Sequence, residues 1–195
     1  MSETANAHIF QTDTDGFDPD KASDQLRQQA RDQHLAGDAA GAIQTLTQAI
    51  QQDPSNPRVA MDMIQVLLDL GQAQSALELF EKLPDAATQT EMGECLNGQL
   101  TFARLANRTE GTDVLTQKLE ENPQDARARF DLSVCLIAAH AYDEAINHLF
   151  VLQADCPDFE QGAPRELILT VINFLSPNNP KLAQKYRQKL NNLLN

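Results

Sequence analysis

The residues with the clearest potential for chemistry are two histidines and a glutamate in the C-terminal half of the chain. His140, Glu144 and His148 recur at intervals of four, which would place three metal-ligand side chains along one helix face. His140 falls at an expected turn, however, and helix packing in a repeat accounts for Glu144 and His148. A second pair of ligands does not accompany them. The sequence therefore predicts no metal site.

The three cysteines do not form a recognisable redox or nucleophilic site. Cys95, Cys135 and Cys156 lack CxxC spacing, and an odd count does not make a disulfide framework. Cys135 lies in an apolar run and is expected in the core. No Ser-His-Asp or Cys-His spacing can be assigned, and neighbouring carboxylates such as Glu120 and Glu121 are expected on a solvated face. We therefore predict a protein that is not an enzyme and has neither a catalytic residue nor a cofactor.

The charge balance restricts the class of partner. The formal net charge is -13, which opposes binding to nucleic acid and to an anionic membrane surface. The N-terminus lacks the basic and apolar regions of a signal peptide. Apolar runs fall short of the roughly 18 residues that a membrane-spanning helix needs. We predict a cytoplasmic protein that binds neither nucleic acid nor membrane.

The elements that carry these residues are organised by a repeat of 34 residues. A period of this length is the signature of a tetratricopeptide (TPR) array, in which helical hairpins stack into a solenoid. We predict an all-α fold of about four hairpins followed by a C-terminal helix pair. The recurring positions are Gly37 and Gly71, Pro123 and Pro157, and Ala42, Ala76, Gly111 and Ala145.

Turn-forming residues divide the chain into expected elements. Residues 1–22 are predicted to be a disordered or remnant segment, and residues 23–195 a TPR-like helical domain with Ser23 as the first N-cap. Gly111 replaces alanine where a small residue allows close helix contact, and His140 replaces a turn glycine. The expected hairpins cover 23–52, 58–83, 86–121 (with one helix over 86–106) and 128–157, and the last two helices cover 164–175 and 180–194.

The first helix of each hairpin in such an array lines a concave face that commonly binds peptides. In this register two hairpins present a mixed apolar and polar set that suits binding of unfolded polypeptide. The same residues could equally pack against neighbouring helices, since apolar stripes usually belong to the core. The set comprises Arg58, Met61, Gln65 and Leu68 in one hairpin and Arg127, Phe130, Val134 and Ile137 in another.

Several segments resemble the bacterial YbbN-type chaperedoxins, which join a thioredoxin-like domain to a TPR region. The resemblance covers roughly residues 23–195, and the opening segment is similar to the start of the thioredoxin-like domain. The rest of the thioredoxin-like domain, with its active-site loop, is not present between this opening segment and the helical repeats. The segments that carry the resemblance are 121–126, 142–145, 185–190 and Leu193-Leu194, with 7–10 and 16–17 at the opening.

The resemblance implies a holdase that binds unfolding clients and passes them to the chaperonin GroEL or to the Hsp70 system. Its thiol function would be missing together with the thioredoxin-like domain. Two alternatives remain open: a thioredoxin-type disulfide oxidoreductase, and a TPR adaptor for multiprotein assembly. By resemblance, docking to the chaperonin would use the last helix, through Lys185, Tyr186, Lys189, Leu190, Leu193 and Leu194.

Overall fold

The computed structural model describes residues 21–194, and every regular element in that range is helical. These residues form two compact units. Unit 1 ends at Thr101, and unit 2 begins at Phe102. Each unit is described here by itself. The predictions for the opening segment, including its resemblance to a thioredoxin-like domain, lie outside the described residues. The division into a segment 1–22 and a domain 23–195 stays a prediction.

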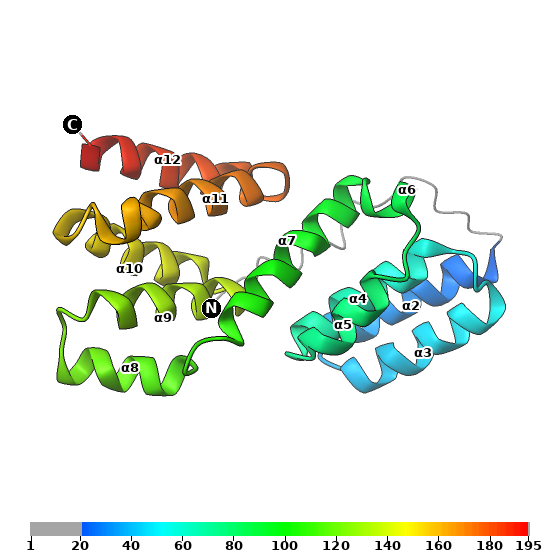
Figure 1. The fold of residues 1–195 in the computed structure, drawn as a ribbon. Helices are drawn as coiled ribbons and strands as arrows, with labels where there is room; N and C mark the ends of the chain where they lie inside the picture. The colour runs from blue at the N-terminus through cyan, green and yellow to red at the C-terminus, as the bar shows by residue number, and fades with distance from the viewer. Residues whose placement is uncertain (1–20, 195) are drawn as a thin grey trace. The chain divides into compact units, whose positions relative to one another are not determined.

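Unit 1 consists of antiparallel helices joined by short turns (Figure 1). Polar side chains start two of them: Asp38 accepts the Gly41 N–H at 2.9 Å, and Asn56 accepts the Arg58 N–H at 3.1 Å. Lys21, rather than the predicted Ser23, is the N-cap of the first helix. The elements are α2 (Ala22–Leu35), α3 (Ala39–Gln52), α4 (Pro57–Asp69), α5 (Ala73–Phe80), α6 (Asp85–Thr88) and α7 (Glu91–Ala106), the last of which continues past Thr101.

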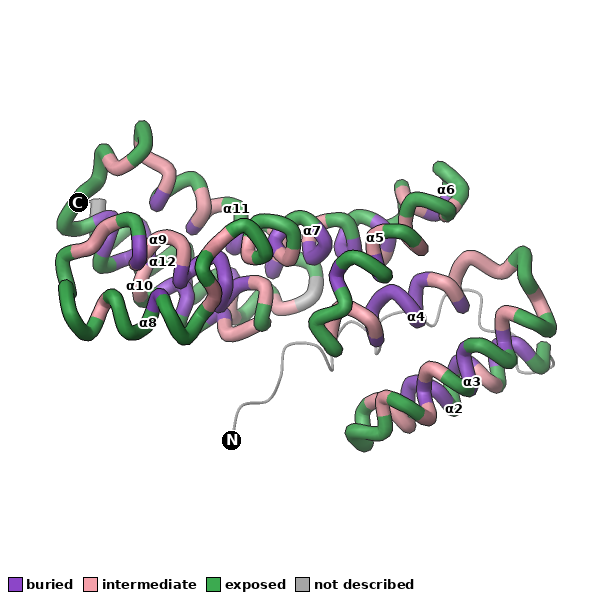
Figure 2. Tube along the Cα trace, turned by 60° about the horizontal axis from the view of Figure 1, so that its bottom comes forward, coloured by how far each residue is buried: buried purple, intermediate pink, exposed green. Residues whose placement is uncertain are grey.

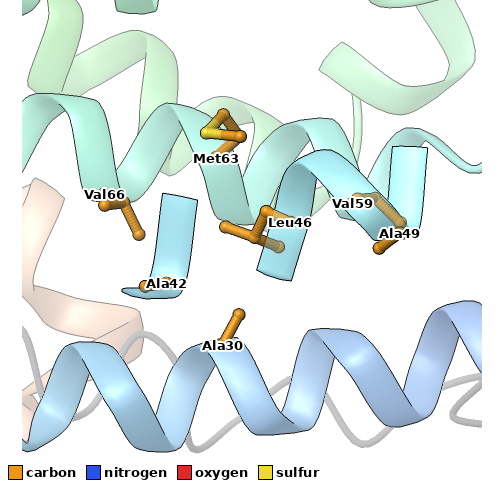
Figure 3. Close-up of a cluster of buried hydrophobic side chains, with 7 residues drawn as sticks. All are labelled: Ala30, Ala42, Leu46, Ala49, Val59, Met63 and Val66. Atoms are coloured by element: carbon orange, nitrogen blue, oxygen red, sulfur yellow. The ribbon is translucent and has the colours of Figure 1, made fainter. Parts of the chain in front are cut away.

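Small residues on α3 allow its neighbours to approach closely. Ala42 and Ala49 are fully buried, and Leu46 lies between them. Figure 3 shows these side chains between Ala30 of α2 and the apolar side chains of α4. A second apolar cluster joins α4 to α5, α6 and α7 through residues that include Ile64 and Leu96. The two clusters share the partly buried Leu67 and Leu79, so the apolar core of unit 1 is continuous.

The helix predicted over 86–106 is divided in two, and that prediction was wrong. Thr90 precedes α7 and caps its first turn, because its hydroxyl accepts the Gly93 N–H at 3.1 Å. Gly93 also lies tightly against the end of α6. A Cβ atom built there would lie 2.4 Å from the Ala87 carbonyl oxygen. The sharp corner between α6 and α7 therefore requires glycine at this position.

Unit 2 continues the hairpin pattern, with successive helices packed in chain order (Figure 1). A turn at positive φ, from Glu160 to Gly162, leads into the last helix pair. The penultimate helix runs past its expected end at Leu175 and includes Pro177 in its last turn. The elements are α8 (Thr112–Glu121), α9 (Ala126–Ala138), α10 (Tyr142–Asp155), a 3-10 turn (Phe159–Gln161), α11 (Ala163–Asn178) and α12 (Pro180–Leu194).

Three of the hairpin turns share one backbone geometry. After α2, the N–H groups of Gly37 and Asp38 donate to carbonyls three and five residues earlier, which is the Schellman arrangement. The turns at Gly71 and His140 repeat it. His140 adopts a φ of 59°, and its ring lies 2.9 Å from the Tyr142 hydroxyl. A residue with a Cβ atom therefore keeps the turn that glycine makes elsewhere.

Gly111 has a different role from the one predicted. It precedes α8 with a φ of 86°, and a Cβ atom there would meet no atom within 4 Å. The glycine therefore serves the turn rather than a close helix contact. Leu115 stands where the alanines stand in the other second helices, at the fourth residue, and it is buried.

Candidate functional site: a polar face of unit 1

Helix α4 is buried on almost all sides, as the purple run along it in Figure 2 shows. Val59, Met63 and Val66 pack toward α3, and Met61 and Ile64 pack toward α5 and α7. At about 100° per residue, the remaining side of α4 lies roughly opposite Leu67. Polar side chains occupy it. We call this the polar face of unit 1 and define it by Asp24, Arg27 and Arg31 of α2, Asp62 and Gln65 of α4, and Gln99 of α7.

Asp62 is the centre of the polar face. Its side chain is 1% exposed, and its two oxygens accept from different arginines. Arg27 donates from Nε at 2.8 Å, and Arg31 donates from a terminal nitrogen at 2.9 Å and from Nε at 3.3 Å. Charge-assisted bonds of this kind are strong and directional. One carboxylate of α4 thus holds two guanidinium groups of α2.

The end of the polar face near the start of α2 carries a second carboxylate and a third arginine. Asp24 accepts from Arg27 at 3.4 Å and from the Asn56 amide at 3.5 Å. Arg58 lies two residues after Asn56, and one of its terminal nitrogens is buried without a hydrogen-bond partner among the described residues. Arg58 lines a pocket together with Lys21, Asp24 and Asp53, so this end carries charges of both signs.

The other end consists of paired amides. Gln65 and Gln99 exchange hydrogen bonds of 3.1 and 2.9 Å between α4 and α7. Gln65 also donates to Asp69 at 3.0 Å, and Asp69 lies 2.6 Å from the His34 ring. An amide offers both a donor and an acceptor, as a peptide backbone does. The polar face as a whole is a buried layer of guanidinium, carboxylate and amide groups that hydrogen-bond to one another.

The predicted peptide-binding residues of α4 belong to two different surfaces. Gln65 is 0% exposed and belongs to the polar face, and Arg58 lies half-buried at its end. Met61 is buried in the apolar cluster with α5 and α7, and Leu68 packs beside it. The structure therefore does not bring the four together, and their role in binding stays a prediction.

The predicted set on α9 is also divided. Val134 and Ile137 are buried. Phe130 packs on Phe159 with ring centroids 5.6 Å apart. Arg127 is exposed and pairs with Glu160 at 3.0 Å. Two of these four residues are thus core, and Arg127 and Phe130 lie toward the turn before α11.

The predicted docking residues of α12 alternate between the core and the surface. Tyr186 and Leu190 are buried, whereas Lys185 and Lys189 reach back to α10, at 2.7 Å from Asp143 and from Asn147 respectively. Burial, with a smaller contribution from the Asp143 carboxylate, raises the pKa of Tyr186 above its usual range. Lys189 also lies over a buried aromatic ring of α10. These contacts fix α12 onto α10.

The exposed part of α12 lies at its end. Leu193 is 39% exposed. Leu194 is helical, but its burial lies outside what the structure describes.

The histidines and cysteines of the described residues do not converge. His140 contacts Tyr142, whereas His148 accepts from Arg129 at 3.3 Å. Burial first, and the Arg129 charge second, lower the pKa of His148. Within residues 21–194 no group of three potential ligands could hold a metal ion. Cys95 and Cys135 are buried and Cys156 is exposed, none of them in a disulfide.

Most of the polar face was missed from the sequence, although its signal was present. Arg31, Gln65 and Gln99 are 34 residues apart and so occupy one position of the repeat. The period is carried most visibly by glycines, alanines and prolines, which mark turns and close helix contacts. The same register predicts that these three polar residues lie on the first helices of successive hairpins.

Comparison with known families agrees with this geometry. Residues 33–93 match one model of the tetratricopeptide repeat, and residues 105–195 match another. The chain carries tetratricopeptide repeats. The predicted all-α TPR solenoid is thereby confirmed. Solenoids of this class present extended surfaces to protein partners, so this TPR chain is a protein-binding scaffold, and neither match describes a catalytic family.

Other comparisons add little. No curated protein matches the chain. A crystal structure of a domain of protein VP0806, of unknown function, from Vibrio parahaemolyticus RIMD 2210633 is 21% identical, with a TM-score of 0.41 over 86% of this chain and 97% of that one. The resemblance to YbbN-type chaperedoxins is not confirmed by these matches. Among the described residues no helix is long and apolar enough to cross a membrane.

Proposed function

We propose that this TPR chain is a co-chaperone-type scaffold that holds polypeptides in extended conformation on the polar face of unit 1. The observation that carries the proposal is the convergence of Arg27, Arg31, Gln65 and Gln99 from three successive hairpins. Guanidinium groups bind carboxylates, and amides bind backbone groups, so together they suit an extended acidic segment.

Holding of unfolded clients is the narrower form of this proposal. It draws on the resemblance of the C-terminal half to chaperedoxins, together with the matches to the tetratricopeptide repeat. The test is light scattering by a heat-unfolded enzyme with and without an equimolar amount of the chain. A holdase delays the rise in scattering. A scattering curve identical to that of the enzyme alone contradicts holding.

Docking to the chaperonin GroEL is proposed for the end of α12. Deleting residues 185–195 would remove the buried Tyr186 and Leu190 and damage unit 2, so a point variant is the sharper probe. Leu193→Asp changes an exposed leucine, and Val114→Asp on α8 is a matched control with a similarly exposed side chain. Pull-down of GroEL should fail for the first variant and not for the second. Equal recovery with both would exclude this docking site.

A TPR adaptor for multiprotein assembly is the second candidate. The buried ion pairs of Asp62 favour it, since they hold α2 and α4 in one arrangement and so give the polar face a defined shape. An adaptor binds one folded partner and leaves aggregation unchanged. The third alternative, a thioredoxin-type oxidoreductase, predicts turnover in an insulin-reduction assay.

A further inference from the structure

The connection that leads into α11 is longer than two other connections between hairpins of the same chain. In the connections before α4 and α9, the N-cap residue stands two positions after a proline, whereas before α11 it stands five positions after one. The three additional residues are the 3-10 turn Phe159–Gln161. The proline and N-cap pairs are Pro54 and Asn56, Pro123 and Asp125, and Pro157 and Gly162.

The inserted turn packs against the start of α9. The Phe159 ring lies on the Phe130 ring, with centroids 5.6 Å apart. The Arg127 guanidinium pairs with the Glu160 carboxylate at 3.0 Å and lies 6.0 Å from the centre of the Phe159 ring. Asp131, on the same helix as Arg127, lies farther from it, at 3.8 Å. An aromatic ring and a carboxylate from adjacent residues of the turn thus contact two side chains of α9.

The backbone of the inserted turn adopts a conformation that residues with side chains disfavour. Glu160 and Gln161 have φ values of 43° and 63°, and Gly162 follows at 89°. Positive φ is uncommon for a residue with a Cβ atom, because that atom crowds the backbone. The described residues of the connections before α4 and α9 contain no positive φ. Strained backbone of this kind persists where other contacts hold it, which here are those of Phe130 and Arg127.

The place of the turn in the repeat indicates a recognition surface. Insertions in one unit of a solenoid often lie on its binding face. α9 is the first helix of its hairpin, and the repeat register predicts Arg127 and Phe130 for the concave face that first helices line. The turn therefore shows which chemistry this part of α9 accepts. It accepts an aromatic ring on Phe130 and, from the next residue, a carboxylate on Arg127.

We propose that Arg127 and Phe130 form a docking site for a protein segment in which an aromatic residue is followed directly by an acidic one, and that Phe159 and Glu160 occupy this site as an internal ligand. A partner segment has to displace the turn. Because the turn is tethered beside the site, its effective concentration there is high, and it sets the apparent affinity for the partner. The site lies within unit 2 and does not depend on the polar face of unit 1.

The test measures binding of a peptide that copies the internal ligand. A fluorescein-labelled peptide with the sequence of residues 157–163 is titrated with the full chain, and fluorescence anisotropy reports binding. The variant F159S/E160S empties the site and keeps the length of the connection. It should bind the peptide about tenfold more tightly than wild type, as expected for a site that the turn occupies about nine-tenths of the time. Adding R127Q to this variant should abolish the gain.

The matched control is D158S/Q161S, which changes two exposed residues on either side of the contact. It should bind the peptide as weakly as wild type. Equal affinity of wild type and F159S/E160S overturns the proposal. Tighter binding by the control also overturns it, because loosening of the turn rather than an emptied site would then be responsible.

Two further measurements keep the test decisive if F159S/E160S loses its helical circular dichroism signal. Deletion of residues 159–161 gives the connection the length of those before α4 and α9 and should produce the same tighter binding. In the wild-type chain, a large excess of unlabelled peptide should shift the NMR signals of the Arg127 side chain and of the Gly162 amide. If neither signal shifts, the peptide does not compete with the turn and the proposal is wrong.

Discussion

Asp62 in unit 1 and Asp131 in unit 2 are both the sixth residue of the first helix of a hairpin, yet their surroundings differ. Asp62 is buried between two arginines of α2. Asp131 is half-buried and lies 3.8 Å from Arg127 on its own helix. Burial raises the pKa of Asp131, and the Arg127 charge opposes the shift. The two aspartates therefore occupy the same position of the repeat, but residues of the neighbouring hairpin determine whether the carboxylate is buried in ion pairs or partly solvated.

The ninth residue of the same helices shows the same divergence. Gln65 exchanges hydrogen bonds with Gln99 of the next hairpin, whereas Val134 is an apolar core residue. Unit 1 therefore has polar side chains at this position, whereas α9 of unit 2 has an apolar one. Polar groups in a buried layer contribute specificity more than stability. The contrast is why the proposed function above is placed on unit 1.

The largest expected effect comes from removing the shared carboxylate of unit 1. Asp62→Asn leaves Arg27 and Arg31 without their common charged partner, which should cost about 3 kcal/mol. Asp131→Asn, at the matched position in unit 2, should cost less than about 1 kcal/mol because its ion pair is partly solvated. Urea denaturation measures both. Similar losses would show that the two positions are equivalent.

The amide pair should give the next largest effect. Gln65→Val leaves the buried Gln99 amide without its partner and should cost about 1–3 kcal/mol. The double variant Q65V/Q99V copies the apolar solution of unit 2 and should recover much of that loss. A double-mutant cycle measures the coupling. Additive losses would contradict the pairing.

A smaller effect is expected at the contact between α12 and α10. Lys185 pairs with Asp143 at 2.7 Å, but both side chains are largely exposed. Lys185→Ala should therefore cost less than about 1 kcal/mol, and Lys181→Ala serves as the exposed control. The Lys185 hydrogen bond lowers the pKa of Asp143 from 3.8, so the contribution is complete above that pH. The contribution is lost as the pH falls through the lowered pKa of Asp143 in the folded chain. If Lys185→Ala still differed in stability from wild type in acid below that pKa, the Lys185–Asp143 ion pair would not be the cause.

The smallest effect concerns His148 of unit 2. Its pKa is lowered from 6.5 in the folded chain, so its neutral form is favoured there. The stability that this provides is complete above pH 6.5 and is lost as the pH falls through the lower folded pKa. Solvent screening of the half-exposed ring keeps the effect below about 1 kcal/mol. When the pH is lowered from about 7.5 to 5, the His148→Gln variant should therefore lose less thermal stability than wild type. Equal losses in the two proteins would contradict a role for His148.

The helical hairpins could be predicted from the sequence because their determinants are local. Gly37 and Gly71 set turns at positive φ, and Ala42 of α3 and Ala76 of α5 are fully buried. The roles of Gly111 and Gly93 do not follow from local sequence in the same way. A glycine can serve a turn or a close approach, and only the neighbouring atoms decide between the two.

The polar face could not be predicted in the same way, because it depends on side chains from three hairpins. Asp62 alone reads as a solvated carboxylate, and its burial follows only from Arg27 and Arg31, more than 30 positions earlier. The same limit explains why Met61 and Val134, both expected on a concave face, are buried in cores. The periodicity of a helix shows which residues share an apolar face, but it does not show which neighbouring element packs against that face.

The most direct test of the central claim, that the polar face of unit 1 binds protein partners, is hydrogen–deuterium exchange of the full chain with and without reduced, carboxymethylated lactalbumin, which stays unfolded. Binding at the polar face should change the exchange of peptides from α2, α4 and α7, while α8 to α12 remain as they were. Exchange that is unaltered throughout the chain, or altered only in unit 2, would contradict it.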